Sequence, residues 1–192
     1  MQRIATCDIL VGVVGTGKTT FLVNSIVKPL SAKGSRILIV TNGDGKDWQD
    51  VDYLTDYEEI KTFTGIRKMI YKKGRLEKIQ QYYSNGALIF DDCRVYIQAQ
   101  TSDFMNWLQI LRRHVGIDLF AVFHGLTQVP PVFFTFASNL VLFHTLDNIK
   151  RRGTYIEDYL FDEINIRKSL ILKEVNKGYR FAFEIIKLDK RL

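Results

Sequence analysis

Short apolar runs bounded by turn residues alternate with amphipathic stretches along most of this chain of 192 residues. Apolar runs of about four to eight residues between turn signals are typical of strands that are buried on both faces. Because amphipathic, helix-like stretches separate these runs, the pattern predicts an α/β fold with a mainly parallel sheet covered by helices. The five runs are Cys7 to Val14, Arg36 to Thr41, Ala87 to Phe90, Leu119 to Phe123 and Leu140 to Phe143.

Two of the intervening stretches carry helix signals. Lys18 to Val27 follows the first run, and we expect this helix to end before Pro29, because proline disrupts a helix interior. A second helix is predicted by apolar residues at positions i, i+3, i+4 and i+7, which form one helix face. These residues are Phe104, Trp107, Leu108 and Leu111.

The last part of the chain changes to an alternating pattern. Tyr179, Phe181, Phe183 and Ile185 alternate with Arg180, Ala182 and Glu184. A period of two predicts a half-exposed strand, added antiparallel at an edge of the sheet. At roughly 150 residues per domain, the length predicts a single domain over residues 1–192.

Composition narrows the class of protein. Hydrophobic residues make up 46% of the chain and charged residues 25%, which excludes a disordered or fibrous protein. Cys7 and Cys93 are the only cysteines and make no disulfide framework, so we expect a reducing, cytoplasmic compartment. No stretch approaches the ~20 apolar residues that span a bilayer, so we expect no membrane insertion.

Charge is segregated in one part of the chain. The segment from Asp44 to Glu59 holds seven acidic residues and one lysine, and that from Lys61 to Lys78 holds seven basic residues and one glutamate. Such runs are usually solvated helix faces. With the net charge of +6, the basic run is alternatively a contact surface for DNA phosphates. The candidate contacts are Arg67, Lys68, Lys72, Lys73, Arg75 and Lys78.

The first apolar run ends in a phosphate-binding motif, since Gly12 to Thr19 fits G-x-x-x-x-G-K-[ST]. Glycines let backbone N–H groups turn toward phosphate oxygens. Lys18 then reaches the β- and γ-phosphates, and the Thr19 hydroxyl reaches Mg²⁺. The preceding strand and following helix are the context that this motif requires. We therefore expect ATP and Mg²⁺ as cofactors, and a nucleotide-binding segment made of Gly12, Val13, Val14, Gly15, Thr16, Gly17, Lys18, Thr19 and Thr20.

Polar residues follow two later runs. Asp91 ends the third run and is the candidate for holding Mg²⁺ through water. Asp92 is the candidate for polarising the attacking water, with a helix or turn cap as its alternative role. His124 and Gln128 follow the fourth run, where the carboxyl ends of parallel strands form the ligand crevice. They are candidates for positioning the γ-phosphate, and a structural histidine is the alternative for His124.

These segments together resemble the FtsK/HerA superfamily of P-loop ATPases. The resemblance rests on the Gly12 to Thr19 loop, on Leu88 to Asp92, and on Arg113 to Leu119, which has the superfamily's Arg-x-x-Gly-Ile turn. The short length and the Asp-Asp pair look most like the genome-packaging ATPases of poxvirus or tectivirus type. The Arg-His-x-Gly form also resembles zonular-occludens-toxin-like phage assembly ATPases. The chain departs from the superfamily at Asp92, where glutamate is usual, and at His124, where glutamine is common.

The resemblance implies a P-loop NTPase three-layer sandwich that hydrolyses ATP to move double-stranded DNA, packaging a viral genome into a preformed capsid. It implies a homo-oligomeric ring, a hexamer or a pentamer, in which Arg113 completes a neighbour's site in trans. Arg112 is the second candidate for this arginine finger, and a helix-end charge is the alternative role of Arg113. A capsid or portal-vertex protein is the implied further partner, in the host cytoplasm or at the capsid vertex.

Two other functions are compatible with the sequence. One is a small P-loop phosphotransferase of the nucleotide-kinase kind, with Arg151 and Arg152 as lid arginines. The other is a nucleotide-dependent switch or assembly protein with little turnover. Sheet order separates the first from the ATPase, because a strand between the P-loop strand and the Asp91 strand favours the ATPase. Slow basal turnover that neither DNA nor self-assembly raises would favour the switch.

Overall fold

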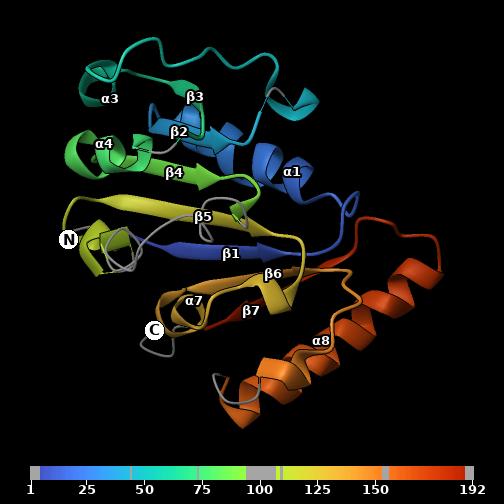
Figure 1. Ribbon diagram of the computed structural model, residues 1–192. Helices are drawn as coiled ribbons and strands as arrows, with labels where there is room; N and C mark the ends of the chain where they lie inside the picture. The colour runs from blue at the N-terminus through green and yellow to red at the C-terminus, as the bar shows by residue number, and fades with distance from the viewer. Residues whose placement is uncertain are drawn as a thin grey trace. The chain divides into compact units, whose positions relative to one another are not determined.

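One mainly parallel sheet organises the fold. The computed structural model describes residues 5–43, 45–72, 74–93, 107, 108, 110–152 and 156–188. Within these residues the sheet has seven strands in the order β3-β2-β4-β5-β1-β6-β7 (Figure 1). This confirms the predicted α/β fold with an antiparallel C-terminal edge strand. The strands are β1 (Cys7–Val11), β2 (Arg36–Thr41), β3 (Ile66–Ile70), β4 (Gly86–Phe90), β5 (Ile117–Phe123), β6 (Asn139–Phe143) and β7 (Phe183–Lys187).

The chain divides into two compact units. The first holds residues 5 and 6 and the described part of Thr19–Ala121, which includes β2, β3, β4 and most of β5. The second holds Cys7–Lys18 and the described residues from Val122 onward, which include β1, β6 and β7. In both units, mainly apolar runs form strands that are buried along almost their whole length, as strands covered on both faces require.

Strand β3 differs from the prediction, because the basic segment is not one continuous helix face. Ile66–Ile70 instead pairs in parallel with β2, with Ile37 opposite Ile66. The β-branched and apolar residues of this segment favour pairing with an existing strand, and the helices α3 (Glu59–Thr62) and α4 (Arg75–Tyr82) flank it in sequence. The charges of the segment are therefore divided between a strand, a turn and a helix.

The helix after the P-loop also differs from the prediction, because it continues past Pro29. It consists of α1 (Lys18–Phe21), a π-helical stretch (Leu22–Val27) and α2 (Lys28–Ala32). The N–H of Lys28 bonds to the carbonyl of Val23, five residues earlier. A proline ring normally clashes with the carbonyl four residues before it, and the widened turn shifts that carbonyl. The ring is thereby accommodated in the first turn of α2.

The C-terminal part of the second unit includes α7 (Pro131–Phe136), β6, α8 (Asp158–Asn176) and β7. Helix α8 packs on β6 and β7 (Figure 1). β7 pairs antiparallel with β6, with Leu140 opposite Ile186, and Ile186 is buried. The exposed face of β7 is the apolar one, since Phe183 and Ile185 lie on it while Glu184 forms an ion pair with Arg167 of α8.

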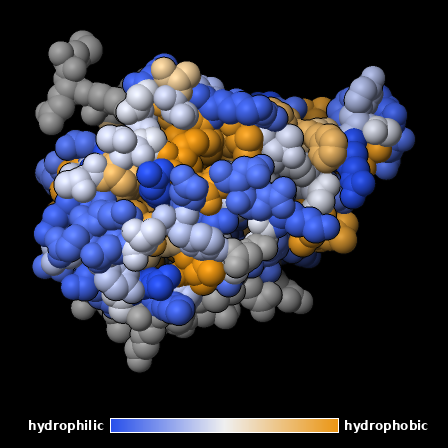
Figure 2. All heavy atoms as spheres, turned by 90° about the horizontal axis from the view of Figure 1, so that it is seen from above, coloured by the Kyte–Doolittle hydropathy of each residue, from blue (hydrophilic) through white to orange (hydrophobic). Residues whose placement is uncertain are grey.

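Exposed apolar side chains occur in both units, among them Tyr53 and Tyr57 in the first and Phe181 and Ile185 in the second. On the face seen in Figure 2, apolar patches lie between polar residues. Scattered exposed apolar residues are ordinary on a protein surface, whereas a continuous row beside a candidate site is informative.

Candidate nucleotide-binding site

The loop after β1 has the backbone that phosphate binding requires. Gly15 and Gly17 have φ of 79° and 91°, in the left-handed region that strains other residues. At Gly12, an added Cβ would lie 2.6 Å from the Cβ of Phe143, so only glycine fits between β1 and β6 there. The N–H of Gly12 bonds to the carbonyl of Phe123 at 3.2 Å, which ties the loop to the end of β5.

Lys18 lies inside this loop. Its side chain is only 6% exposed, and its ammonium donates to the carbonyls of Gly12 at 2.6 Å and Val13 at 2.9 Å. The Thr16 hydroxyl also donates to the Val13 carbonyl, at 2.8 Å. The loop therefore combines a glycine-rich backbone with the positive charge of Lys18. This combination fits the phosphates of a nucleotide. Thr19 and Thr20 follow in the first turn of α1, and Val14 is exposed at the tip of the loop.

The two consecutive aspartates after β4 are both held by residues of the first unit. One oxygen of Asp91 accepts a hydrogen bond from the Trp48 indole N–H at 2.7 Å. Asp92 has φ of 62°, and its carboxylate accepts a hydrogen bond from the amide of Asn42 at 3.1 Å. A non-glycine residue in this region stores backbone strain, which is commonly found at functional sites.

Sequence patterns assign no role at the site to Asn42 or Trp48. Asn42 lies just after β2, and Trp48 belongs to a short 3₁₀ helix, Lys46–Trp48, inside the acidic run. Trp48 is buried although its neighbours in sequence are polar or charged. A tryptophan inside such a polar run was the available signal that this segment folds back onto the protein.

Asp92→Asn is expected to keep nucleotide binding and to lower ATP turnover roughly 10²-fold or more, because the variant cannot accept a proton from water. Asparagine tolerates a positive φ, so the backbone at this position should be preserved. Turnover and nucleotide affinity would be measured together, with Asp50→Asn, an exposed aspartate, as the control. Normal turnover of Asp92→Asn would assign the orientation of water to another residue.

The loop after β5 is held by an aspartate from the chain after β6. His124 follows β5 directly, and Gln128 ends a 3₁₀ helix, Leu126–Gln128. The carboxylate of Asp147 accepts hydrogen bonds from the Thr127 N–H at 2.9 Å and from its hydroxyl at 3.1 Å. Lys168 of α8 donates to the Asp147 carbonyl. Burial lowers the pKa of Lys168, and the Asp147 charge opposes that shift. The predicted γ-phosphate residues therefore lie on an anchored loop.

Arg113 and Arg112 lie in different surroundings. Arg112 is wholly buried and donates to the backbone carbonyls of Ala5 at 3.0 Å and Thr6 at 2.8 Å. The prediction that Arg112 is the second candidate for the arginine finger is therefore wrong, because its guanidinium is buried and bonded to the backbone of its own chain. Arg113 instead lines a surface pocket that also includes Asn85 and Asp118.

The apolar helix face predicted before Arg113 is only partly observed. Trp107 and Leu108 are buried, Leu111 is 45% exposed, and Phe104 lies outside the described residues. Leu111 and Arg113 belong to a 3₁₀ helix, Leu111–Arg113, whose period of about three residues removes Leu111 from the face that an α-helix would give it.

The basic residues predicted to contact DNA are not equivalent. Lys68 is 4% exposed, and its ammonium donates to the Trp48 carbonyl at 2.8 Å, so it is part of the core rather than of a contact surface. Arg75 binds the Tyr57 hydroxyl at 3.0 Å, and Lys78 lies over the ring of Tyr82. Arg67 lies 3.8 Å from Asp52, Lys72 is exposed, and Lys73 lies outside the described residues.

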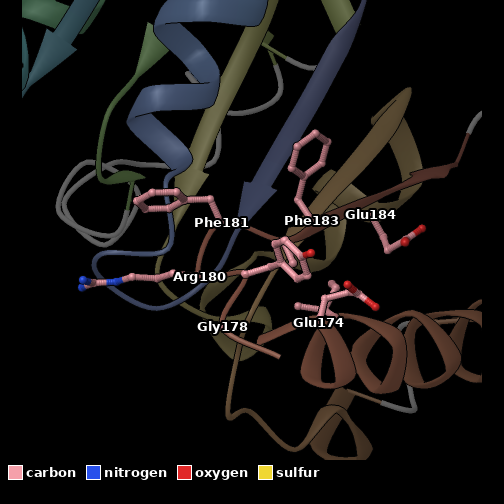
Figure 3. A pocket seen from close by; sticks show the side chains of 9 residues that line it. Glu174, Gly178, Arg180, Phe181, Phe183 and Glu184 are labelled. Carbon is pink, nitrogen blue, oxygen red and sulfur yellow. The ribbon is translucent and has the colours of Figure 1, made fainter. Parts of the chain in front are cut away.

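Two residues that the sequence had not suggested lie against the P-loop. An added Cβ on Gly17 would be 2.8 Å from the Phe181 ring, and one on Gly15 would be 3.1 Å from a terminal nitrogen of Arg180. Both residues come from the turn between α8 and β7 (Figure 3). No motif marks them, since the alternation of residues 179–185 is explained equally well by an edge strand.

Among the residues that the structure describes, no helix is long and apolar enough to cross a membrane. The same residues include no group of three or more His, Cys, Asp or Glu side chains placed to hold a metal ion. A magnesium ion held by Thr19 and Asp91 with phosphate oxygens and water would not require such a group, because Mg²⁺ usually keeps several waters and binds one or two carboxylates.

Comparisons with solved structures identify the fold. No protein-family model and no curated protein matches the sequence. The genome packaging NTPase B204 from Sulfolobus turreted icosahedral virus 2, in complex with sulfate, is similar with a TM-score of 0.74 and 16% identity, over 100% of this chain and 95% of that one. The same NTPase in complex with ATP-γS is similar with a TM-score of 0.71 and 16% identity, over 98% of this chain and 94% of that one. The pCW3 conjugation coupling protein TcpA is similar with a TM-score of 0.52 and 13% identity, over 74% of this chain and 50% of that one. The chain thus has the P-loop NTPase fold, in the form seen in a viral packaging ATPase.

Proposed function

We propose that this chain is an ATP-hydrolysing motor that moves double-stranded DNA, working as a homo-oligomeric ring that packages a viral genome into a preformed capsid. The observation that carries the proposal is the sheet order, in which β5 lies between β4 and β1. β1 leads into the P-loop, and β4 ends in Asp91 and Asp92. This order favours the ATPase over the small phosphotransferase. Similarity to a viral genome packaging NTPase over the whole chain supports the same function.

The residues of the site divide the chemistry as follows. The P-loop amides and Lys18 bind the β- and γ-phosphates. The Thr19 hydroxyl and, through water, Asp91 would hold Mg²⁺, which would neutralise charge on the phosphate oxygens. Asp92 orients the attacking water and takes its proton, while His124 and Gln128 position the γ-phosphate. The strained backbone at Asp92 and its bond to Asn42 fix the direction of that carboxylate.

In the proposed ring, a neighbouring subunit supplies the arginine that completes each active site. An arginine delivered by a neighbour stabilises the charge that spreads over the γ-phosphoryl oxygens in the transition state. Arg113 is the residue proposed for this role, and a capsid or portal-vertex protein is the proposed anchor of the ring. The chain acts as a single domain in this scheme, at the capsid vertex in the host cytoplasm.

The experiment that tests the function measures ATP turnover with and without double-stranded DNA, on protein whose assembly state is followed by light scattering. The motor predicts turnover that rises with DNA and with assembly. Turnover that neither DNA nor assembly raises would favour the nucleotide-dependent switch and would contradict the motor.

Lys72→Ala combined with Lys78→Ala is expected to weaken DNA binding and DNA-stimulated turnover while leaving basal turnover unchanged. Each lost phosphate contact should reduce the slope of log affinity against log salt by about 0.9. Binding would be measured at several salt concentrations, with Lys33→Ala, an exposed lysine of another segment, as the control. An unchanged salt slope in the double variant would show that this surface does not contact DNA.

A further inference from the structure

The turn after α8 has a fixed backbone. Gly178 has φ of 97° and ends the helix, and the N–H of Tyr179 bonds to the carbonyl of Glu174 at 3.0 Å. The N–H of Gly178 also bonds to the carbonyl of Val175 at 2.9 Å. This pair of bonds is the Schellman arrangement, which reverses the chain in a defined direction. The turn that follows, Tyr179–Ala182, is closed by a bond of 3.2 Å between its ends.

The reversed chain places two side chains on the P-loop. The ring of Phe181 lies against Gly17, and the guanidinium of Arg180 reaches Gly15 (Figure 3). Phe181 as a whole residue nevertheless remains 61% exposed, which leaves ring surface available to a ligand. Among the described residues Arg180 forms no ion pair, and its charge is therefore available beside a loop built for phosphate.

A pocket opens beside these residues. Its volume is ≈ 600 Å³, and Tyr179, Phe181, Phe183 and Ile171 supply aromatic and apolar surface to it. This size falls within the range of about 300–1,000 Å³ that is usual for small-molecule sites. Since Phe181 belongs both to the pocket lining and to the contact with Gly17, the pocket adjoins the P-loop.

The two carboxylates of the pocket are neutralised. Glu174 pairs with Lys177 at 2.6 Å, and Glu184 pairs with Arg167 at 2.8 Å. In Figure 3 both glutamates point away from the side on which Arg180 and Phe181 approach the P-loop. An anionic ligand on that side therefore meets the positive charge of Arg180 and no uncompensated acid from the pocket.

We infer that the Tyr179–Ala182 turn completes the nucleotide site of the same subunit. The nucleoside base stacks on the exposed face of the Phe181 ring, and Arg180 contacts a phosphate. This inference rests on the proposed function for the presence of ATP. The P-loop recognises phosphates through its backbone and gives no contact to the base, so a π-face beside the loop is the available surface for it.

The test compares the affinities of ATP and of inorganic tripolyphosphate, measured by calorimetry with Mg²⁺. Phe181→Leu keeps apolar bulk against Gly17 but removes the ring, and Phe181→Trp restores a ring. Phe181→Leu should weaken ATP binding roughly 5- to 100-fold without changing tripolyphosphate binding, and Phe181→Trp should bind ATP normally. Arg180→Ala should weaken both ligands. Ile185→Ala, an exposed apolar residue outside the pocket, is the control.

The remaining outcomes distinguish failure of the inferred nucleoside site from failure of the proposed motor function. Equal weakening of both ligands by Phe181→Leu would mean that the ring only supports the P-loop, and no weakening would mean that the base lies elsewhere. If the variants show the expected binding pattern but DNA does not raise the turnover of the wild-type protein, the motor is contradicted and the nucleoside site stands. A wild-type protein that binds neither ligand would contradict both.

Discussion

Lys18→Ala is expected to abolish ATP turnover, with a loss of at least roughly 10²-fold, because it removes the cation nearest the transferred phosphoryl group. The ammonium is buried in the P-loop and donates to the carbonyls of Gly12 and Val13. Turnover would be measured at saturating ATP beside thermal unfolding, since the two carbonyls lose a donor and the variant should be destabilised by about 1–3 kcal/mol.

Lys33→Ala is the matched control, because this lysine is exposed at the end of the same helical segment and lies outside the P-loop. Its turnover should equal that of the wild-type protein. A folded Lys18→Ala protein with near-normal turnover would overturn the assignment of the loop as the catalytic nucleotide site.

Most of the strands could be predicted because their residues are almost entirely apolar. β2 was predicted with its observed ends, and β4 and β5 each begin at most two residues earlier than expected. β3 was missed because Arg67 and Lys68 interrupt its apolar pattern. Lys68 can be buried there because its ammonium donates to the Trp48 carbonyl and lies over the Tyr53 ring. Such compensation comes from distant residues and leaves no local pattern.

The residues of the candidate site also fall into those that local motifs predict and those that distant contacts position. The P-loop and the Asp91-Asp92 pair are local motifs, so the sequence alone locates them. Trp48, which holds Asp91, and Asp147, which holds the loop after β5, act through contacts between segments far apart in the chain. Arg180 reaches the P-loop for a similar reason, since its position depends on where α8 ends. The choice between Arg112 and Arg113 depended on the type of helix at residues 111–113, which apolar spacing did not distinguish.

Arg113 is expected to act across a subunit boundary. It precedes β5, which pairs in parallel with β4 so that Gly86 faces Ile117 and Phe90 faces Ala121. Arg113 and Asp91 therefore lie at opposite ends of β4, whose five residues span about 13 Å at ~3.3 Å per residue. Contact with the nucleotide of its own subunit is accordingly awkward, and a neighbour's nucleotide is the natural target.

Arg113→Ala should lower turnover by roughly 10³- to 10⁵-fold, the range measured for arginine fingers. Mixing Arg113→Ala with Lys18→Ala should restore part of the activity, because some boundaries then pair an intact Lys18 site with an intact Arg113. Turnover per wild-type subunit should also rise with protein concentration as rings assemble. The mixture would be assayed after light scattering has established that the two variants assemble together. If such mixed rings recover no activity, Arg113 does not act in trans and is a surface charge at a helix end.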